Sequence, residues 1–177
     1  MAEALTIRTR SGFGLATITA RKGVAAGAIG QALGLVAPAG PVWTAAEGVM
    51  LLGTGPGVWL AHAETVSPFW GDGLRQRLAG LAAVSDQSGA CVVLRLSGAG
   101  ARIALRRGAS IDLDPAAFRP DAVVVTAIAH IGVTFWQVDA VPTYDIAVPR
   151  SFIGSFHHWL DVTAAAIRLP VPASGEA

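Results

Sequence analysis

Hydrophobic and polar positions along the chain predict short strands that alternate with helices. The first half shows the pattern of a strand, a helix, two strands and a helix, over residues 14–20, 24–35, 48–52, 58–62 and 68–83. The two central strands are separated by Gly53-Thr54-Gly55-Pro56-Gly57, which is typical of a turn. The helix predicted over 68–83 depends on Leu74, Leu78 and Leu81, which recur on one helical face.

The second half repeats this order with one additional strand. Its pattern is that of a strand, a helix, three strands and a helix, over residues 90–96, 98–107, 123–129, 133–138, 144–148 and 152–168. Ser97 and Ser151 directly precede the two helices and are predicted to cap their N-termini. The last helix has the clearest amphipathic pattern, with apolar residues from Phe152 to Ile167 at spacings of three and four.

The repeated order predicts an α+β fold made of two similar βαββα-type units. Helices that interrupt hairpin-like strands favour this class over a doubly wound parallel sheet. We expect an N-terminal segment over 1–12 and a single domain over 13–168, with two subdomains over about 13–84 and 85–168. Residues 169–177 contain Pro170 and Pro172 and are expected to form a mobile tail.

The chain is apolar and poor in charge. Hydrophobic residues make up 53% of it and charged residues 14%, against roughly 25% charged residues in a typical domain. No apolar stretch reaches the roughly 20 residues that a membrane-spanning helix needs, and residues 1–10 lack the apolar core of a secretory signal. Burial against partner proteins therefore accounts for the missing charge, with an alanine-rich compositional bias as the alternative. We expect a cytoplasmic protein.

Four side chains are candidates for contacts with such partners. Phe69 and Trp70 follow Pro68 and have the character of interface anchors. His157 and His158 lie on the last predicted helix as polar residues that face solvent or a partner. The formal charge of +1 without a basic face argues against nucleic acid as a partner.

No set of residues predicts a catalytic, cofactor-binding or metal site. Cys91 is the single cysteine, so no intrachain disulfide is possible, and a reducing compartment is expected. Adjacent His157 and His158 diverge by about 100° on a helix and cannot readily bind one ion. Gly98-Ala99-Gly100 opens a predicted helix after a strand, as in dinucleotide-binding proteins, but Ile103 stands where the third glycine belongs.

An ordered set of blocks between about Gly53 and Ala166 resembles a known family. The blocks are Gly55-Pro56-Gly57-Val58-Trp59-Leu60, residues 81–88, residues 92–102, Ile111-Asp112-Leu113-Asp114 with Phe118, Trp136-Gln137-Val138-Asp139, and Val148-Pro149-Arg150-Ser151-Phe152 with Trp159-Leu160. In this order and spacing they are similar to the gamma subunit of bacterial heterotetrameric sarcosine oxidase.

The resemblance implies a fold and a role. The fold would be that of the folate-binding aminomethyltransferases. The complex would demethylate sarcosine oxidatively to glycine with tetrahydrofolate and oxygen and produce hydrogen peroxide, using FAD, FMN, NAD, tetrahydrofolate and zinc held in other subunits. This chain would be a non-catalytic subunit partnered by alpha, beta and delta subunits. The alternatives are a stand-alone aminomethyltransferase-like protein that binds tetrahydrofolate, and a nucleotide-binding module built on Gly98–Gly100.

Overall fold

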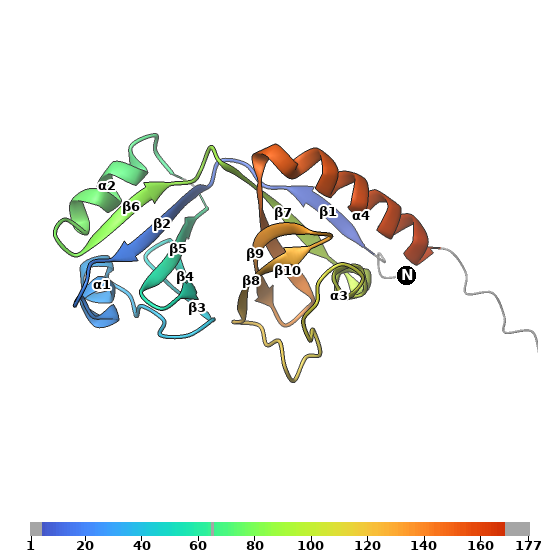
Figure 1. Cartoon of the computed structure of the whole chain (residues 1–177), viewed down its shortest axis with the longest axis horizontal. Helices are drawn as coiled ribbons and strands as arrows, with labels where there is room; N and C mark the ends of the chain where they lie inside the picture. Colours follow the sequence, from blue (N-terminus) through green and yellow to red (C-terminus); the bar gives the residue numbers. More distant parts are fainter. Residues whose placement is uncertain (1–4, 65, 169–177) are drawn as a thin grey trace, which may run out of the picture.

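The chain forms two five-stranded sheets that face each other, with helices on the outer sides. The computed structural model describes residues 5–64 and 66–168, and Figure 1 shows the two sheets side by side with α1 and α2 on one flank and α3 and α4 on the other. Every strand pairing in both sheets is antiparallel. This arrangement confirms the predicted α+β class.

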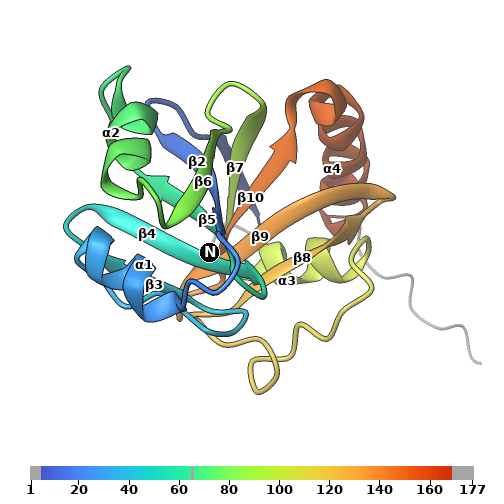
Figure 2. The same cartoon turned by 60° about the vertical axis from the view of Figure 1, so that its left-hand side comes forward.

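The first sheet has the order β3-β4-β5-β2-β6 and the second the order β1-β7-β10-β9-β8. Figure 2 shows the first sheet together with β7, β10, β9 and β8 of the second. The first unit consists of β2 (Gly14–Ala20), α1 (Ala26–Leu33), β3 (Trp43–Ala46), β4 (Val49–Gly55), β5 (Val58–Ala63), α2 (Trp70–Arg77) and β6 (Ala82–Asp86). The second consists of β1 (Thr6–Thr9), β7 (Cys91–Ser97), α3 (Ala99–Arg106), β8 (Val123–Ile128), β9 (Ile131–Asp139), β10 (Thr143–Pro149), η1 (Arg150–Phe152) and α4 (Ile153–Arg168).

The two units share one topology. In each, a central strand leads through a helix into a three-stranded meander and then into a second helix, and an edge strand completes the sheet beside the central strand. The edge strand of the first sheet is β6, which follows α2 directly. The edge strand of the second is β1, which comes from the opposite end of the chain, and Figure 1 shows it beside α4 and far from α1. The predicted internal repeat is therefore real at the level of topology.

Three strands were not predicted, and the helix predicted over 68–83 is too long. Gly80 adopts a φ of +78°, which ends the helical path after α2, and the chain then pairs with β2 as β6. The strand β3 is only four residues long, so its alternation is too short to recognise. Residues 6–9 of the expected N-terminal segment form β1, and the first sheet extends to Asp86, two residues beyond the expected subdomain boundary.

Neither predicted serine cap is present. Gly98, with a φ of +94°, occupies the N-cap position of α3, and no side chain caps that helix. Ser151 lies inside the 3-10 turn η1 that precedes α4. The expected tail 169–177 lies outside the described residues. None of the helices in the described part of the chain is long and apolar enough to cross a membrane.

Three apolar clusters hold the fold together. Each sheet buries its outer face under its own two helices, around Trp59 and Ile29 in the first unit and around Phe135 and Phe156 in the second. The third cluster joins the inner faces of the two sheets, and we call it the central layer. Its buried members are Leu15, Leu52, Leu60, Val93, Val123, Trp136 and Ala147.

Gly53 allows a loop to pass very close to β4. A Cβ atom at this position would lie 2.0 Å from the carbonyl oxygen of Gly40, and the Gly53 N–H donates a hydrogen bond to the Val42 carbonyl at 3.0 Å. Because the obstructing atom belongs to the backbone, a rotamer change cannot remove the clash.

We predict that Gly53→Ala lowers the free energy of unfolding by about 1–3 kcal/mol, the usual range for overpacking. Gly73→Ala is the matched control, because Gly73 lies in α2 and a Cβ atom there would meet no atom within 4 Å apart from adjacent residues and the backbone of its own helix. This substitution should stabilise the fold by up to about 1 kcal/mol. Urea unfolding of both variants checks this. Equal effects of the two substitutions would contradict the close approach.

Candidate functional site

On the inner faces of the two sheets, the polarity of the side chains changes along the strands. Side chains two residues apart share one face of a strand. On β7 this face carries Cys91, then Val93 of the central layer, then Arg95, and on β10 their register partners are Pro149, Ala147 and Asp145. One end of the interface is therefore charged, the middle is apolar and the other end is neutral.

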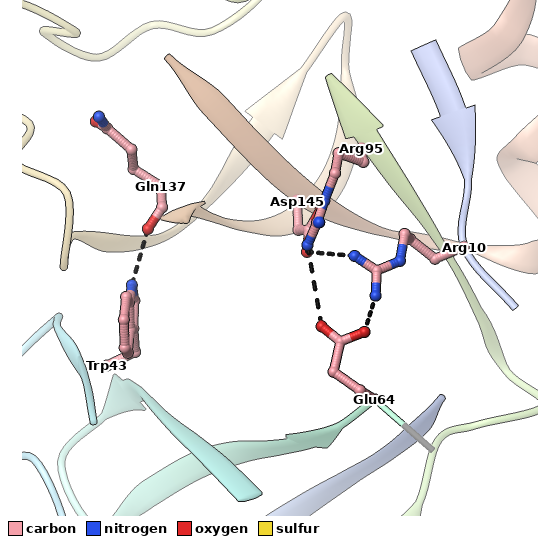
Figure 3. Close-up of polar contacts among 6 residues, drawn as sticks. All are labelled: Arg10, Trp43, Glu64, Arg95, Gln137 and Asp145. Carbon is pink, nitrogen blue, oxygen red and sulfur yellow. Dashed lines mark hydrogen bonds and ion pairs between the residues drawn. The ribbon is translucent and has the colours of Figure 1, made fainter. Parts of the chain in front are cut away.

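The charged end holds two arginines and two carboxylates, which we call the ion cluster: Arg10, Glu64, Arg95 and Asp145 (Figure 3). The Arg95 guanidinium donates two hydrogen bonds of 2.7 Å to the two carboxylate oxygens of Asp145, whose side chain is only 2% exposed. This bidentate bond raises the pKa of Arg95.

Glu64 connects this pair to the first sheet. It directly follows β5 and forms an ion pair with Arg10, while its other oxygen lies 4.0 Å from an Arg95 nitrogen. Arg10 also lies 3.7 Å from Asp145. The cluster therefore spans the two sheets, with its charges balanced.

His62 lies beside the ion cluster and is 1% exposed. Its ring stacks on Phe13 at a centroid distance of 6.0 Å and lies 5.7 Å from the ring of Trp136. Burial lowers the pKa of His62 to about 4, with smaller contributions from Asp145, which raises it, and from Arg10 and Arg95, which lower it. Its Nε2 and the Trp136 Nε1 are buried with no partner among the described residues. His62 is therefore a neutral ring within the interface.

A second connection joins the sheets at β3 and β8. The Trp43 N–H donates to the Asp121 carbonyl at 2.9 Å, and the Val123 N–H donates to the Pro41 carbonyl at 2.8 Å. The Trp43 indole Nε1 also donates to the Gln137 carbonyl at 2.8 Å, as Figure 3 shows. These bonds fix the edge of one sheet against the edge of the other.

The neutral end of the interface is open. There the sheets leave a cavity of about 360 Å³, which we call the inter-sheet groove. Eleven residues from both sheets line it and none is charged; among them are Leu15, Leu60, Cys91, Val125, Ala147 and Pro149. Burial raises the pKa of the Cys91 thiol, against a smaller opposing effect of Arg150. The thiol is therefore protonated at neutral pH and is a weak nucleophile.

The titratable groups of the interface are held in structural contacts. Both Asp145 oxygens are bound by Arg95, and His62 is enclosed between aromatic rings. Within residues 5–64 and 66–168, no group of three or more His, Cys, Asp or Glu side chains is arranged to hold a metal ion. The arrangement can fix two sheets in one orientation and can present an uncharged groove.

The four predicted contact residues do not come together. Trp70 begins α2 and packs against Gly14, where a Cβ would lie 2.5 Å from its ring, so it belongs to the core of the first unit, whereas Phe69 is 73% exposed. His157 is half-buried and His158 exposed on α4, on the opposite flank of the molecule (Figure 1). A contact role for these residues stays a prediction.

The Gly98–Gly100 turn serves the fold. Gly98 directly follows β7 and is the N-cap residue of α3, and the nearby Arg102 donates to the Tyr144 hydroxyl at 3.0 Å. This bond orients the Arg102 side chain toward the second sheet. Ile103 stands in α3 where the third glycine belongs, so the residues at this turn do not match the dinucleotide-binding pattern.

The sarcosine oxidase gamma subunit family matches residues 18–166 of the chain. The chain belongs to this family. A gamma subunit of sarcosine oxidase from Arthrobacter sp. is 33% identical over 148 residues, which cover 83% of this chain and 72% of that protein. The gamma subunit from Corynebacterium sp. strain P-1 is 31% identical over 155 residues, with the same shares covered. The resemblance seen in the sequence blocks is thereby confirmed.

Two solved structures are similar to this gamma-family chain. One is the heterotetrameric sarcosine oxidase from Corynebacterium sp. U-96 in complex with pyrrole 2-carboxylate, at a TM-score of 0.85, 27% identity and coverage of 96% of this chain and 88% of that one. The other is the glycine cleavage system aminomethyltransferase T from Bartonella henselae, at a TM-score of 0.64 and 14% identity, covering 89% of this chain and 45% of that one. The second likeness concerns the fold alone and agrees with the predicted fold.

Sequence reasoning missed the ion cluster in this gamma-family chain. The usable signal was a charged residue in the middle of an apolar strand: Arg95 in β7 and Asp145 in β10. A charged residue needs a partner of opposite charge when its strand is buried on both faces, and the charges of Arg95 and Asp145 are opposite. The involvement of Arg10 and Glu64 could not be found in this way, because it depends on how the sheets meet.

The stability of the fold should depend on pH through His62. The unfolded chain binds a proton at His62 below about pH 6.5, whereas the folded chain does so only near pH 4. Stability should therefore fall as the pH drops through this window, by up to about 3 kcal/mol from this group. Urea unfolding between pH 7.5 and pH 4 measures the slope.

His62→Leu should flatten this slope, because the titrating ring is gone. His158→Leu on the surface of α4 is the matched control and should keep the slope of the unaltered chain. If both variants retain the full slope, the acid sensitivity comes from another group.

Proposed function

We propose that this chain is the non-catalytic gamma subunit of a heterotetrameric sarcosine oxidase. The observation that carries the proposal is the structural match to a chain of the heterotetrameric enzyme over 96% of this chain, together with membership in the gamma subunit family. The activity is the oxidative demethylation of sarcosine to glycine with tetrahydrofolate and oxygen, which yields hydrogen peroxide. The proposed partners are alpha, beta and delta subunits.

The role of the chain in this complex is structural. Its buried acid is bound by arginine, its buried histidine is neutral between aromatic rings, and its thiol has a raised pKa, so the contacts of these groups are those of a scaffold. We propose that FAD, FMN, NAD, tetrahydrofolate and zinc are held by the other subunits. A cytoplasmic location is part of the same proposal.

A stand-alone tetrahydrofolate-binding protein is the alternative. The likeness to the aminomethyltransferase covers 45% of that chain at 14% identity and supports the shared fold, whereas the family match supports the subunit role.

Co-expression tests the proposal. A tagged form of this chain should recover alpha, beta and delta subunits encoded in the same genome, and the purified complex should release hydrogen peroxide when sarcosine is added. The chain purified alone should release none. Recovery of the chain without partners would contradict the subunit role.

The alternative has its own measurement. Titration of tetrahydrofolate into the isolated chain should give no heat of binding in a calorimeter. Binding at micromolar concentration would favour the stand-alone folate protein instead.

A further inference from the structure

The inter-sheet groove is bordered by a strand edge whose backbone bonds are incomplete. β8 is the last strand of the second sheet. The Gln137 N–H donates to the Ala122 carbonyl, so even-numbered residues of this strand direct their backbone groups toward β9. Odd-numbered residues direct theirs away from it, as the Val123 bond to Pro41 and the Ala129 bond to Gly108 show.

The unoccupied part of this edge centres on Val125. On the two sides of Val125 along the strand, the N–H groups of Val123 and Ala129 are already bonded to the carbonyls of Pro41 and Gly108. Within residues 5–64 and 66–168, no bond to the N–H or C=O of Val125 is found. An exposed donor and acceptor on an edge strand form a template for an added strand.

Val125 also presents its side chain to the groove. This side chain is 56% exposed, and its neighbours across β9 and β10 are small or uncharged, such as Gly132, Thr134 and Ala147. The absence of charge along the described lining favours an uncharged occupant, because a charged side chain would lose its hydration there without gaining a partner. A volume of about 360 Å³ at the mouth of two sheets suits a few apolar side chains.

We propose that the inter-sheet groove and the β8 edge at Val125 bind an extended, uncharged segment of a larger partner subunit. The segment pairs with the backbone of Val125 and places apolar side chains between the two sheets. This inference rests on the proposed function, because it names the surface through which the gamma subunit joins the assembly.

Cys91 provides a probe within the groove wall, because it is the single cysteine of the chain. The purified chain and the co-expressed complex are treated with N-ethylmaleimide at pH 8.5, and the modified fraction of this chain is followed by mass spectrometry. The proposal predicts that assembly slows modification at least tenfold. An equal rate in both states overturns it.

A pair of valine substitutions tests the edge. Val125→Lys places a charge at the groove mouth, and Val141→Lys is the matched control, because Val141 is 67% exposed between β9 and β10 and does not line the groove. Val125→Lys should reduce recovery of the larger subunits at least tenfold, whereas Val141→Lys should leave it unchanged. Equal recovery with Val125→Lys and the unaltered chain overturns the proposal.

Three further readings keep the result decisive. Thermal unfolding of the free variants shows whether Val125→Lys folds, and if it does not, the Cys91 labelling decides.

A chain lacking residues 169–177 is labelled as well; a rise in its Cys91 reactivity would show that this chain's own end fills the groove, which overturns the proposal. If the unaltered chain recovers no partner, the proposed function fails, whereas normal recovery with unprotected Cys91 refutes only the docking site.

Discussion

The structure depends on the contact between the inner faces of two sheets through the central layer. Each sheet already has a core under its own helices, so this layer decides whether the halves act as one body. Trp136 is its largest member and is fully buried. An aromatic side chain of this kind buries about 150–250 Å², which at roughly 25 cal/mol per Å² contributes several kcal/mol. The layer occupies the middle of the interface and leaves both ends to other interactions.

The ion cluster gives the interface its orientation more than its stability. The desolvation free energy of Asp145 and Arg95 offsets much of the electrostatic attraction between them. Each ion pair of the half-exposed Glu64 contributes about 0–1 kcal/mol to stability. A shift of register between β7 and β10 would separate Arg95 from Asp145 and leave a buried carboxylate alone. The cluster therefore penalises wrong pairings. His62 adds a sensitivity to acid at the same place, since protonation would add a charge beside the two arginines.

The sequence predicted the elements that have long patterns and missed those that depend on pairing. The strands β7 to β10 and the helices α1, α3 and α4 lie within two residues of their predicted bounds, because each has a sustained apolar period. β1, β3 and β6 are edge strands with at most five residues, and their conformation follows from the neighbour that they pair with. The ion cluster and the groove combine residues as distant as Arg10 and Asp145, so one-dimensional spacing does not reveal them. The ordered sequence blocks, in contrast, were sufficient to identify the family.

In the proposed role, the gamma subunit supplies surfaces that bind other chains rather than catalytic residues. The pseudo-symmetric pairing of two units produces one closed, charged end and one open, neutral end, and the low share of charged residues agrees with a surface that other chains cover. Amide hydrogen exchange of the chain, free and in the co-purified complex, tests this role most directly. We expect the Val125 amide in the segment 123–128 to become protected on assembly, while the β9 amides that bond to β8 are slow in both states. Identical exchange of segment 123–128 in the free chain and in the complex would contradict it.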